Sequence, residues 1–138
     1  MPGNTAPLYV GTVRCWLSDA VILAANTTLD LTSGTIYLLA TGGVNGSRLD
    51  RLDLQPIGTN VATVIRLWVN NGQTTATAAN NRWWRDYALP GTTTSATVSI
   101  PSVIVELNMV LEASFRLYAT LGTTVAAGYH GLVTGGDY

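Results

Sequence analysis

The chain has 138 residues, a length typical of one domain that can bury a hydrophobic core without disulfides or metals. Its single cysteine, Cys15, excludes an internal disulfide, and a net charge of −1 with no lysine argues against binding to nucleic acid through the phosphates. The longest apolar run, residues 20–25, is far shorter than the roughly twenty residues that span a membrane.

The small number of charged residues has a consequence for the surface of the protein. Only 11% of residues are charged, compared with about 25% in a typical soluble domain. The mean hydropathy is +0.26. A small domain of this kind is expected to cover much of its surface against neighbours. We expect a single domain over residues 1–138, with residues 1–8 as an extended N-terminal arm.

Alternation of apolar and polar side chains with a period of two, typical of half-buried strands, begins clearly at residues 35–41. Ile36, Leu38 and Ala40 are predicted to share one face of this strand, which would point into a core. The glycines and asparagine of residues 42–46 are typical of a turn and predict that the strand ends there.

The next alternating segment, residues 61–69, is predicted to be a strand with two chemically different faces. Arg66 and Trp68 are expected on its outward face. Its core face is expected to be formed by four apolar residues, Val61, Ile65, Leu67 and Val69. The asparagine-rich residues 70–81 then predict a long hairpin tip that leads into a partner strand at residues 82–89.

Two later segments, residues 102–108 and 112–120, also alternate and are predicted to be strands. Their expected core-facing residues are Val103, Val105 and Leu107 in the first segment and Ala113, Phe115, Leu117 and Ala119 in the second. Residues 107–121 carry some apolar spacing of three and four that would fit a helix. The alternation favours strands.

Residue usage supports the same fold class along the whole chain. Threonine accounts for twenty positions, and β-branched and aromatic residues suit a pleated surface. Turn sequences separate the alternating segments, and no segment is typical of a crossover helix. The sequence therefore predicts an all-β fold, an antiparallel β-sandwich that is jelly-roll-like and has about eight strands.

A search for catalytic or metal-binding groups gives no convincing set. His130 is the only histidine, and we interpret it as a turn or interface residue rather than a base or ligand. Glu106 and Glu112 could form a glycosidase pair, but a solvated or interface position is favoured. Asp50 and Asp53 alternate with arginines, which favours local ion pairs over calcium binding. We therefore expect no enzyme, no cofactor and no metal site.

Aromatic and guanidinium side chains are the most conspicuous candidates for binding. We predict five of them as interface anchors: Arg66, Trp68, Trp83, Trp84 and Arg85. Tryptophan and arginine are enriched at the energetic centres of protein interfaces. Neighbouring residues of a strand point to opposite faces, so one tryptophan of the 83–84 pair is expected in the core and the other at the surface. Plain packing and stacking on sugar rings remain alternative interpretations.

Three short motifs resemble those of a family of small tailed-bacteriophage and prophage virion proteins. They are residues 46–52 (GSRLDRL), residues 64–72 (VIRLWVNNG) and residues 135–138 (GGDY). The resemblance covers roughly residues 42–138. The long tip at residues 70–81 and the paired tryptophans depart from the family pattern.

The resemblance implies a head decoration, or cement, protein on the capsid surface of a virion that is made in the host bacterial cytoplasm. It also implies a jelly-roll-like homotrimer that binds the major capsid protein, with no catalytic residues and with neither nucleic acid nor membrane as a partner. A receptor- or carbohydrate-binding knob of a phage tail or fibre is the alternative hypothesis. A small hydrolase, acting through Glu106, is a third.

Overall fold

The structure is a computed structural model that describes residues 10–138, so the arm expected at residues 1–8 lies outside the described residues. Residues 10–138 form eight strands and one short 3₁₀-helix: β1 (Thr12–Leu17), β2 (Tyr37–Thr41), β3 (Ser47–Pro56), β4 (Thr63–Asn70), η1 (Ala78–Asn80), β5 (Asn81–Leu89), β6 (Val103–Leu111), β7 (Arg116–Leu121) and β8 (Tyr129–Asp137). No helix within this part of the chain is long and apolar enough to cross a membrane.

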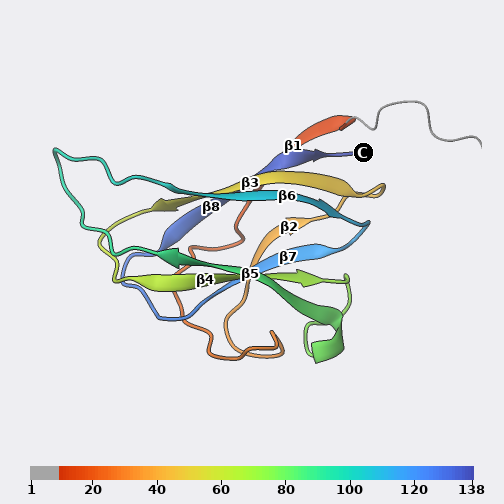
Figure 1. Ribbon diagram of the computed structural model, residues 1–138, viewed down its shortest axis with the longest axis horizontal. Coiled ribbons are helices and arrows are strands. Elements are labelled where there is room, and N and C mark those ends of the chain that lie inside the picture. Colours follow the sequence, from red (N-terminus) through yellow and green to blue (C-terminus); the bar gives the residue numbers. More distant parts are fainter. Residues whose placement is uncertain (1–9) are drawn as a thin grey trace, which may run out of the picture.

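The strands form two four-stranded antiparallel sheets that lie one above the other (Figure 1). Sheet A has the order β1-β8-β3-β6, and sheet B has the order β2-β7-β4-β5. These two orders place β1, β3, β6 and β8 opposite β2, β4, β5 and β7, which is the arrangement of an eight-stranded jelly roll. The predicted all-β, antiparallel, jelly-roll-like sandwich is therefore confirmed.

The main core lies between the two sheets. Leu49, Leu52 and Leu54 of β3 are buried, with a register shift between Leu49 and Arg51. They face Ile65 and Leu67 of β4 across the core. Strands β3 and β6 keep an exposed residue between most of their buried ones, as the period-two pattern in the sequence predicts. Sheet A is thus buried on one face and open on the other.

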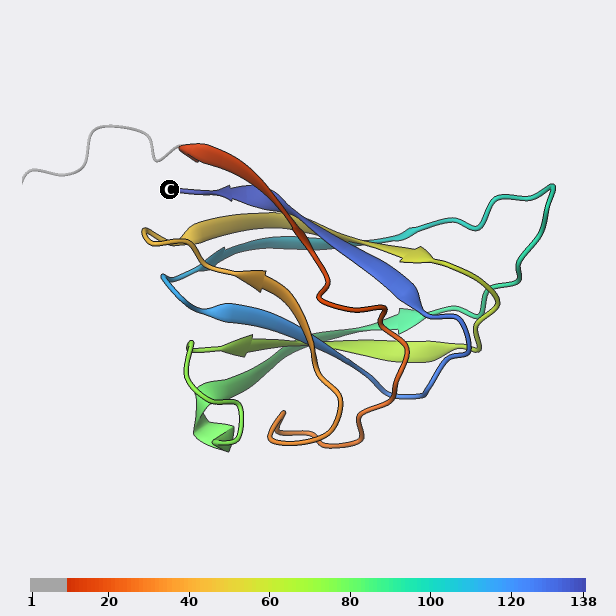
Figure 2. The same ribbon diagram turned by 180° about the vertical axis from the view of Figure 1, so that it is seen from behind.

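Sheet B differs, because a second and smaller core covers its outer face. Five of the six residues of β7 are buried, so both faces of this strand are covered. The segment between β1 and β2, orange in Figure 2, places Leu31 with none of its surface exposed against Trp68 and Tyr118. Ile36 and Leu38 complete this cluster. The chain itself therefore covers the outer face of sheet B.

Side-chain hydrogen bonds hold the covering segment in place. The Asn26 amide donates to the carbonyl oxygens of Ser33 (2.8 Å) and Thr35 (3.0 Å). The Asn81 amide of β5 donates to the Asp30 carbonyl oxygen at 2.9 Å. The backbone N–H of Thr32 donates to the Asp30 carboxylate, and this bond lowers the pKa of that carboxyl. Leu31 lies between these contacts with a left-handed backbone (φ 63°), a conformation that costs a branched residue energy.

Three of the predicted core faces are wrong in detail, and in the segment 112–120 the error is that Ala113 lies in a turn and is exposed. The pairing of β2 with β7 shifts register between Leu38 and Ala40, so Leu39 and Ala40 enter the main core while Leu38 lies in the second cluster. The expectation of one shared face for Ile36, Leu38 and Ala40 fails because a bulge inserts one residue. Val61 lies before β4 and is 58% exposed, so it is not a core residue.

The hairpin predicted after residue 69 is confirmed. Strands β4 and β5 pair from Thr63 to Leu89 and are joined by a long tip that contains η1. The strand predicted at residues 112–120 starts later than expected, because a turn at residues 112–115 separates β6 from β7. Residues 107–121 are therefore not helical, and the choice of strands over a helix is confirmed.

Candidate functional site

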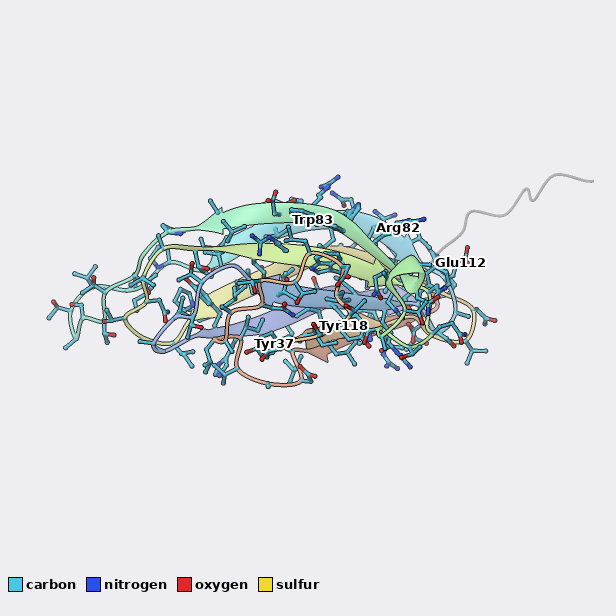
Figure 3. The ribbon with its side chains drawn as sticks, turned by 90° about the horizontal axis from the view of Figure 1, so that it is seen from below. Tyr37, Arg82, Trp83, Glu112 and Tyr118 are labelled. Atoms are coloured by element: carbon cyan, nitrogen blue, oxygen red, sulfur yellow. The ribbon has the colours of Figure 1, made fainter. Side chains whose placement is uncertain are left out.

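An aromatic stack lies on the outer face of sheet B, as the sequence predicts. The rings of Trp68 and Trp83 are stacked with 5.7 Å between their centroids, and the Arg66 guanidinium lies 5.6 Å from the Trp83 ring centroid. Trp83 lies on β5 in Figure 3, with Tyr118 nearer the middle of that view. Attraction of the guanidinium to the ring face stabilises this arrangement by about 1 kcal/mol.

Trp68 is not available at the surface, which corrects the expectation of an exposed anchor. It is only 2% exposed, because Leu31 and Tyr118 pack against it. Its indole N–H donates to the Thr120 hydroxyl at 3.1 Å, so the polar atom is satisfied inside the protein. Trp83 remains 45% exposed and is the part of the stack that an external molecule can reach.

Strand alternation places the two neighbouring tryptophans on opposite faces, and a bulge in β5 places Arg85 on the same side as Trp84. Leu67 pairs with Arg85, and Trp68 pairs with Trp83, so Trp84 is the extra residue. Trp84 packs against the main core while Trp83 stays on the outer face, which confirms that one lies in the core and one at the surface. The Arg85 guanidinium lies 4.5 Å from the Trp84 ring centroid. The five predicted anchors therefore belong to two groups on opposite sides of β5.

The side chains considered for catalysis and for metal binding lie on the surface or in local ion pairs. Glu106 and Glu112 are both exposed. Among residues 10–138, no three His, Cys, Asp or Glu side chains are close enough together to hold a metal ion. The predicted local ion pairs are confirmed, since Arg48 contacts Asp50 at 2.8 Å and Arg51 contacts Asp53 at 3.2 Å.

Two of the three motifs that resemble phage virion proteins, residues 46–52 and 135–138, meet in sheet A, whereas residues 64–72 form β4 of sheet B. Ser47 lies opposite Asp137, and Arg48 lies opposite Gly136, so the first and last motifs form adjacent strands. The Ser47 hydroxyl donates to the Asp137 carboxylate, which also lies 3.5 Å from the Arg14 guanidinium. A Cβ on Gly135 would lie 2.0 Å from the Arg48 carbonyl oxygen, so this position requires glycine. These residues support the fold, and they do not form a catalytic centre.

The outer face of sheet A carries a feature that sequence reasoning missed. Four of its side chains are large, apolar and mostly exposed: Val13 (87%), Leu17 (75%), Ile104 (53%) and Val110 (60%). Register alone places Leu17, Leu132, Asp53 and Ile104 in one row across the four strands. The alternation of residues 12–17, with Val13 and Leu17 on one face, was the available signal in the sequence.

A groove of about 630 Å³ crosses this face of sheet A. Leu17, Ile104 and Leu132 supply apolar walls, and His130 and Asp53 supply polar groups. One carboxylate oxygen of Asp53 bonds Arg51, while Oδ1 is buried and has no hydrogen-bond partner among residues 10–138. Buried acceptors are usually paired. That oxygen is closed off from the surface, so the groove is mainly an apolar depression with His130 among its polar lining residues.

Comparison of the chain with protein-family models, with curated proteins and with solved structures finds no match. The resemblance to phage virion proteins rests on the three motifs and their order.

Proposed function

We propose that the protein is a structural protein of a phage virion, a capsid decoration protein that stabilises the head by binding neighbouring capsid subunits. One observation carries the proposal. The chain covers the outer face of sheet B with its own residues and leaves apolar side chains exposed across the outer face of sheet A. Several large apolar side chains exposed on one sheet face favour an interaction site, although Arg48 and Asp53 of β3 lie between them.

The proposed mechanism is association rather than chemistry. Subunits bind one another as a homotrimer and bind the major capsid protein. Full burial of a side chain such as Ile104 or Leu17 contributes on the order of 1–2 kcal/mol. A trimer that holds several such contacts at once dissociates slowly, because each released contact stays close to its partner.

The sandwich topology is compatible with this role without establishing it. Eight-stranded jelly rolls occur in viral capsid proteins and in lectins, and a fold alone does not assign a function. The capsid assignment therefore depends on the open face of sheet A together with the motifs at residues 46–52 and 135–138.

The test is binding of the purified protein to phage capsids that lack it. Ile104→Asp places a charge on the open face of sheet A and is expected to abolish binding. Val61→Asp is the matched control, because Val61 is similarly exposed (58% against 53%) but lies just before β4 of sheet B. Circular dichroism checks that both variants fold. Absence of immunogold label from intact particles, or equal binding by both variants, would contradict the proposal.

Exposed Trp83 favours a second candidate, a glycan-binding knob of a tail or fibre. An accessible indole face beside the Arg66 guanidinium is suited to stacking on a sugar ring and to bonding its hydroxyls. Binding on a glycan array that is lost in Trp83→Ala and kept in Ile104→Asp would favour this candidate over the decoration protein.

A further inference from the structure

Strand β1 forms one edge of sheet A and pairs, within residues 10–138, with β8 alone. It is the red strand beside β8 in Figure 2. An unpaired strand edge presents free N–H and C=O groups that can pair with another strand, and proteins usually protect such edges with bulges, charges or covering loops. The question is therefore which edges of this sandwich are protected.

The other edges of the described sandwich all carry a protection. Strand β5 is bulged at Trp84, and β6 shifts register and contains Asn108 with a left-handed backbone (φ 44°). Strand β2 is bulged, and Asp19 bonds both the N–H and the carbonyl oxygen of Leu38 at 3.1 Å. Strand β1 carries one charge, Arg14, but it alone pairs without a register shift, over six consecutive residues.

The free side of β1 can be assigned residue by residue. The N–H of Ser18 donates to the Gly131 carbonyl oxygen at 2.9 Å. Hydrogen-bonding direction alternates along an antiparallel strand, so the even-numbered residues of β1 bond to β8. The backbone groups of Val13, Cys15 and Leu17 then point away from the sheet, toward the free side.

We propose that β1 pairs with β1 of a second copy of this chain, antiparallel and centred on Cys15, which joins the two A sheets into one eight-stranded sheet. The sequence of the strand is self-complementary in this register. On the outer face, Val13 lies opposite Leu17 of the second copy, so the two most exposed apolar side chains of sheet A cover each other twice. On the inner face, Arg14 lies opposite Trp16 of the second copy.

The Arg14–Trp16 pairing repeats an attraction already present within one chain, where the Arg14 guanidinium lies 5.7 Å from the Trp16 ring centroid. Arg14 also contacts Asp137, so the two arginines that approach each other are each next to a carboxylate. Val13, Cys15 and Leu17 each exchange two backbone hydrogen bonds with the second copy in this register. This contact requires neither a capsid nor the proposed trimer.

Cysteine cross-linking of the full chain tests the register. Directly opposite residues of such a pair have Cα atoms about 5.5 Å apart, within the range of a disulfide. Mild oxidation is expected to link the exposed Cys15 to its copy. In a Cys15→Ser background, a mixture of Val13→Cys chains and Leu17→Cys chains is expected to cross-link. Neither variant is expected to cross-link by itself, because residue 13 lies opposite residue 17 of the second copy. Val110→Cys is the control, because Val110 is exposed on β6 at the far edge of the same sheet.

Sedimentation under reducing conditions tests the contact without a cross-link. Val13→Lys with Leu17→Lys is expected to halve the mass of the particle, whether or not copies also associate elsewhere. The control Val61→Lys with Val98→Lys is expected to leave the mass unchanged, because both residues are similarly exposed but lie outside sheet A. An unchanged mass in the Val13/Leu17 variant, or cross-linking at Val110 equal to that at Cys15, overturns the proposal. A wild-type chain that stays monomeric at every concentration overturns it too, as expected if a different extended chain occupied the edge.

Discussion

Replacing Leu31 by alanine tests whether the covering segment is a second core or a loose loop. Leu31 has none of its surface exposed and packs against Trp68 and Tyr118. A buried leucine-to-alanine change costs about 2–5 kcal/mol. The segment can partly collapse onto the gap, so we expect a loss near the lower end, about 2–3 kcal/mol. For a chain of this size that corresponds to a fall in Tm of roughly 6–12 °C.

The loss should appear in urea unfolding and in thermal unfolding followed by circular dichroism. Acrylamide should also quench more of the tryptophan fluorescence, because Trp68 becomes accessible. Leu29→Ala is the matched control. The Leu29 side chain lies two residues before Leu31 and is 57% exposed, so its removal should change stability by less than about 0.5 kcal/mol. A similarly small effect of Leu31→Ala, with unchanged quenching, would refute the second core.

Leu31→Gly separates packing from backbone strain at the same position. At an ordinary buried position glycine is less stable than alanine by about 1 kcal/mol. The left-handed backbone of Leu31 (φ 63°) removes that disadvantage, because only glycine adopts it freely. The glycine variant should therefore be at least as stable as the alanine variant. A glycine variant that is clearly less stable would show that the strain is negligible.

Three further predictions follow from buried polar groups and from the tryptophan pair. The Tyr129 hydroxyl is buried without a hydrogen-bond partner among residues 10–138, so Tyr129→Phe should stabilise the protein at pH 7 by about 1 kcal/mol, measured by urea unfolding. Burial raises the pKa of Tyr129 above its ordinary value of 10.0. Above that value the unfolded chain loses the proton while the folded chain keeps it, so wild-type stability should fall as pH rises through 10 and the phenylalanine variant should fall less; identical slopes would contradict this. The buried Asn60 side chain accepts from the N–H groups of Ala127 (2.9 Å) and Gly128 (2.8 Å), so Asn60→Ala should cost at least about 3 kcal/mol in the same assay. Trp84→Ala should lower the thermal midpoint several times more than Trp83→Ala, because only Trp84 packs against the main core. Equal shifts would show that the two side chains do not lie on opposite faces of β5.

The sequence predicted the fold class because alternation directly reports one buried face. The residues predicted to face the core in segment 102–108, and all but Val61 of those in segment 61–69, lie in or against the main core as expected. The prediction of core faces failed where a bulge adds one residue to a strand. The bulge at Leu38/Ala40 changes which residue faces inward, and a period-two pattern contains no information about such an insertion.

The candidate site was harder to predict because exposure depends on distant segments. Arg66, Trp68 and Trp83 do lie together, as the hairpin predicted. Burial of Trp68 is decided by Leu31, which is far away in the chain and has no pattern that assigns it to that face. The open face of sheet A likewise emerges only when β1, β8, β3 and β6 are placed side by side.

The place of β8 in sheet A has a consequence for synthesis. This strand is the latest in the chain, yet it lies between β1 and β3. Until β8 emerges from the ribosome, β1 has no neighbouring strand and sheet A remains incomplete. A chain made at about 5–20 residues per second therefore exposes unpaired edges of strands β1 and β3 of sheet A until β8 has been synthesised. Stalled or prematurely terminated chains should be the main source of aggregates, and chaperones that act on nascent chains should raise the soluble yield.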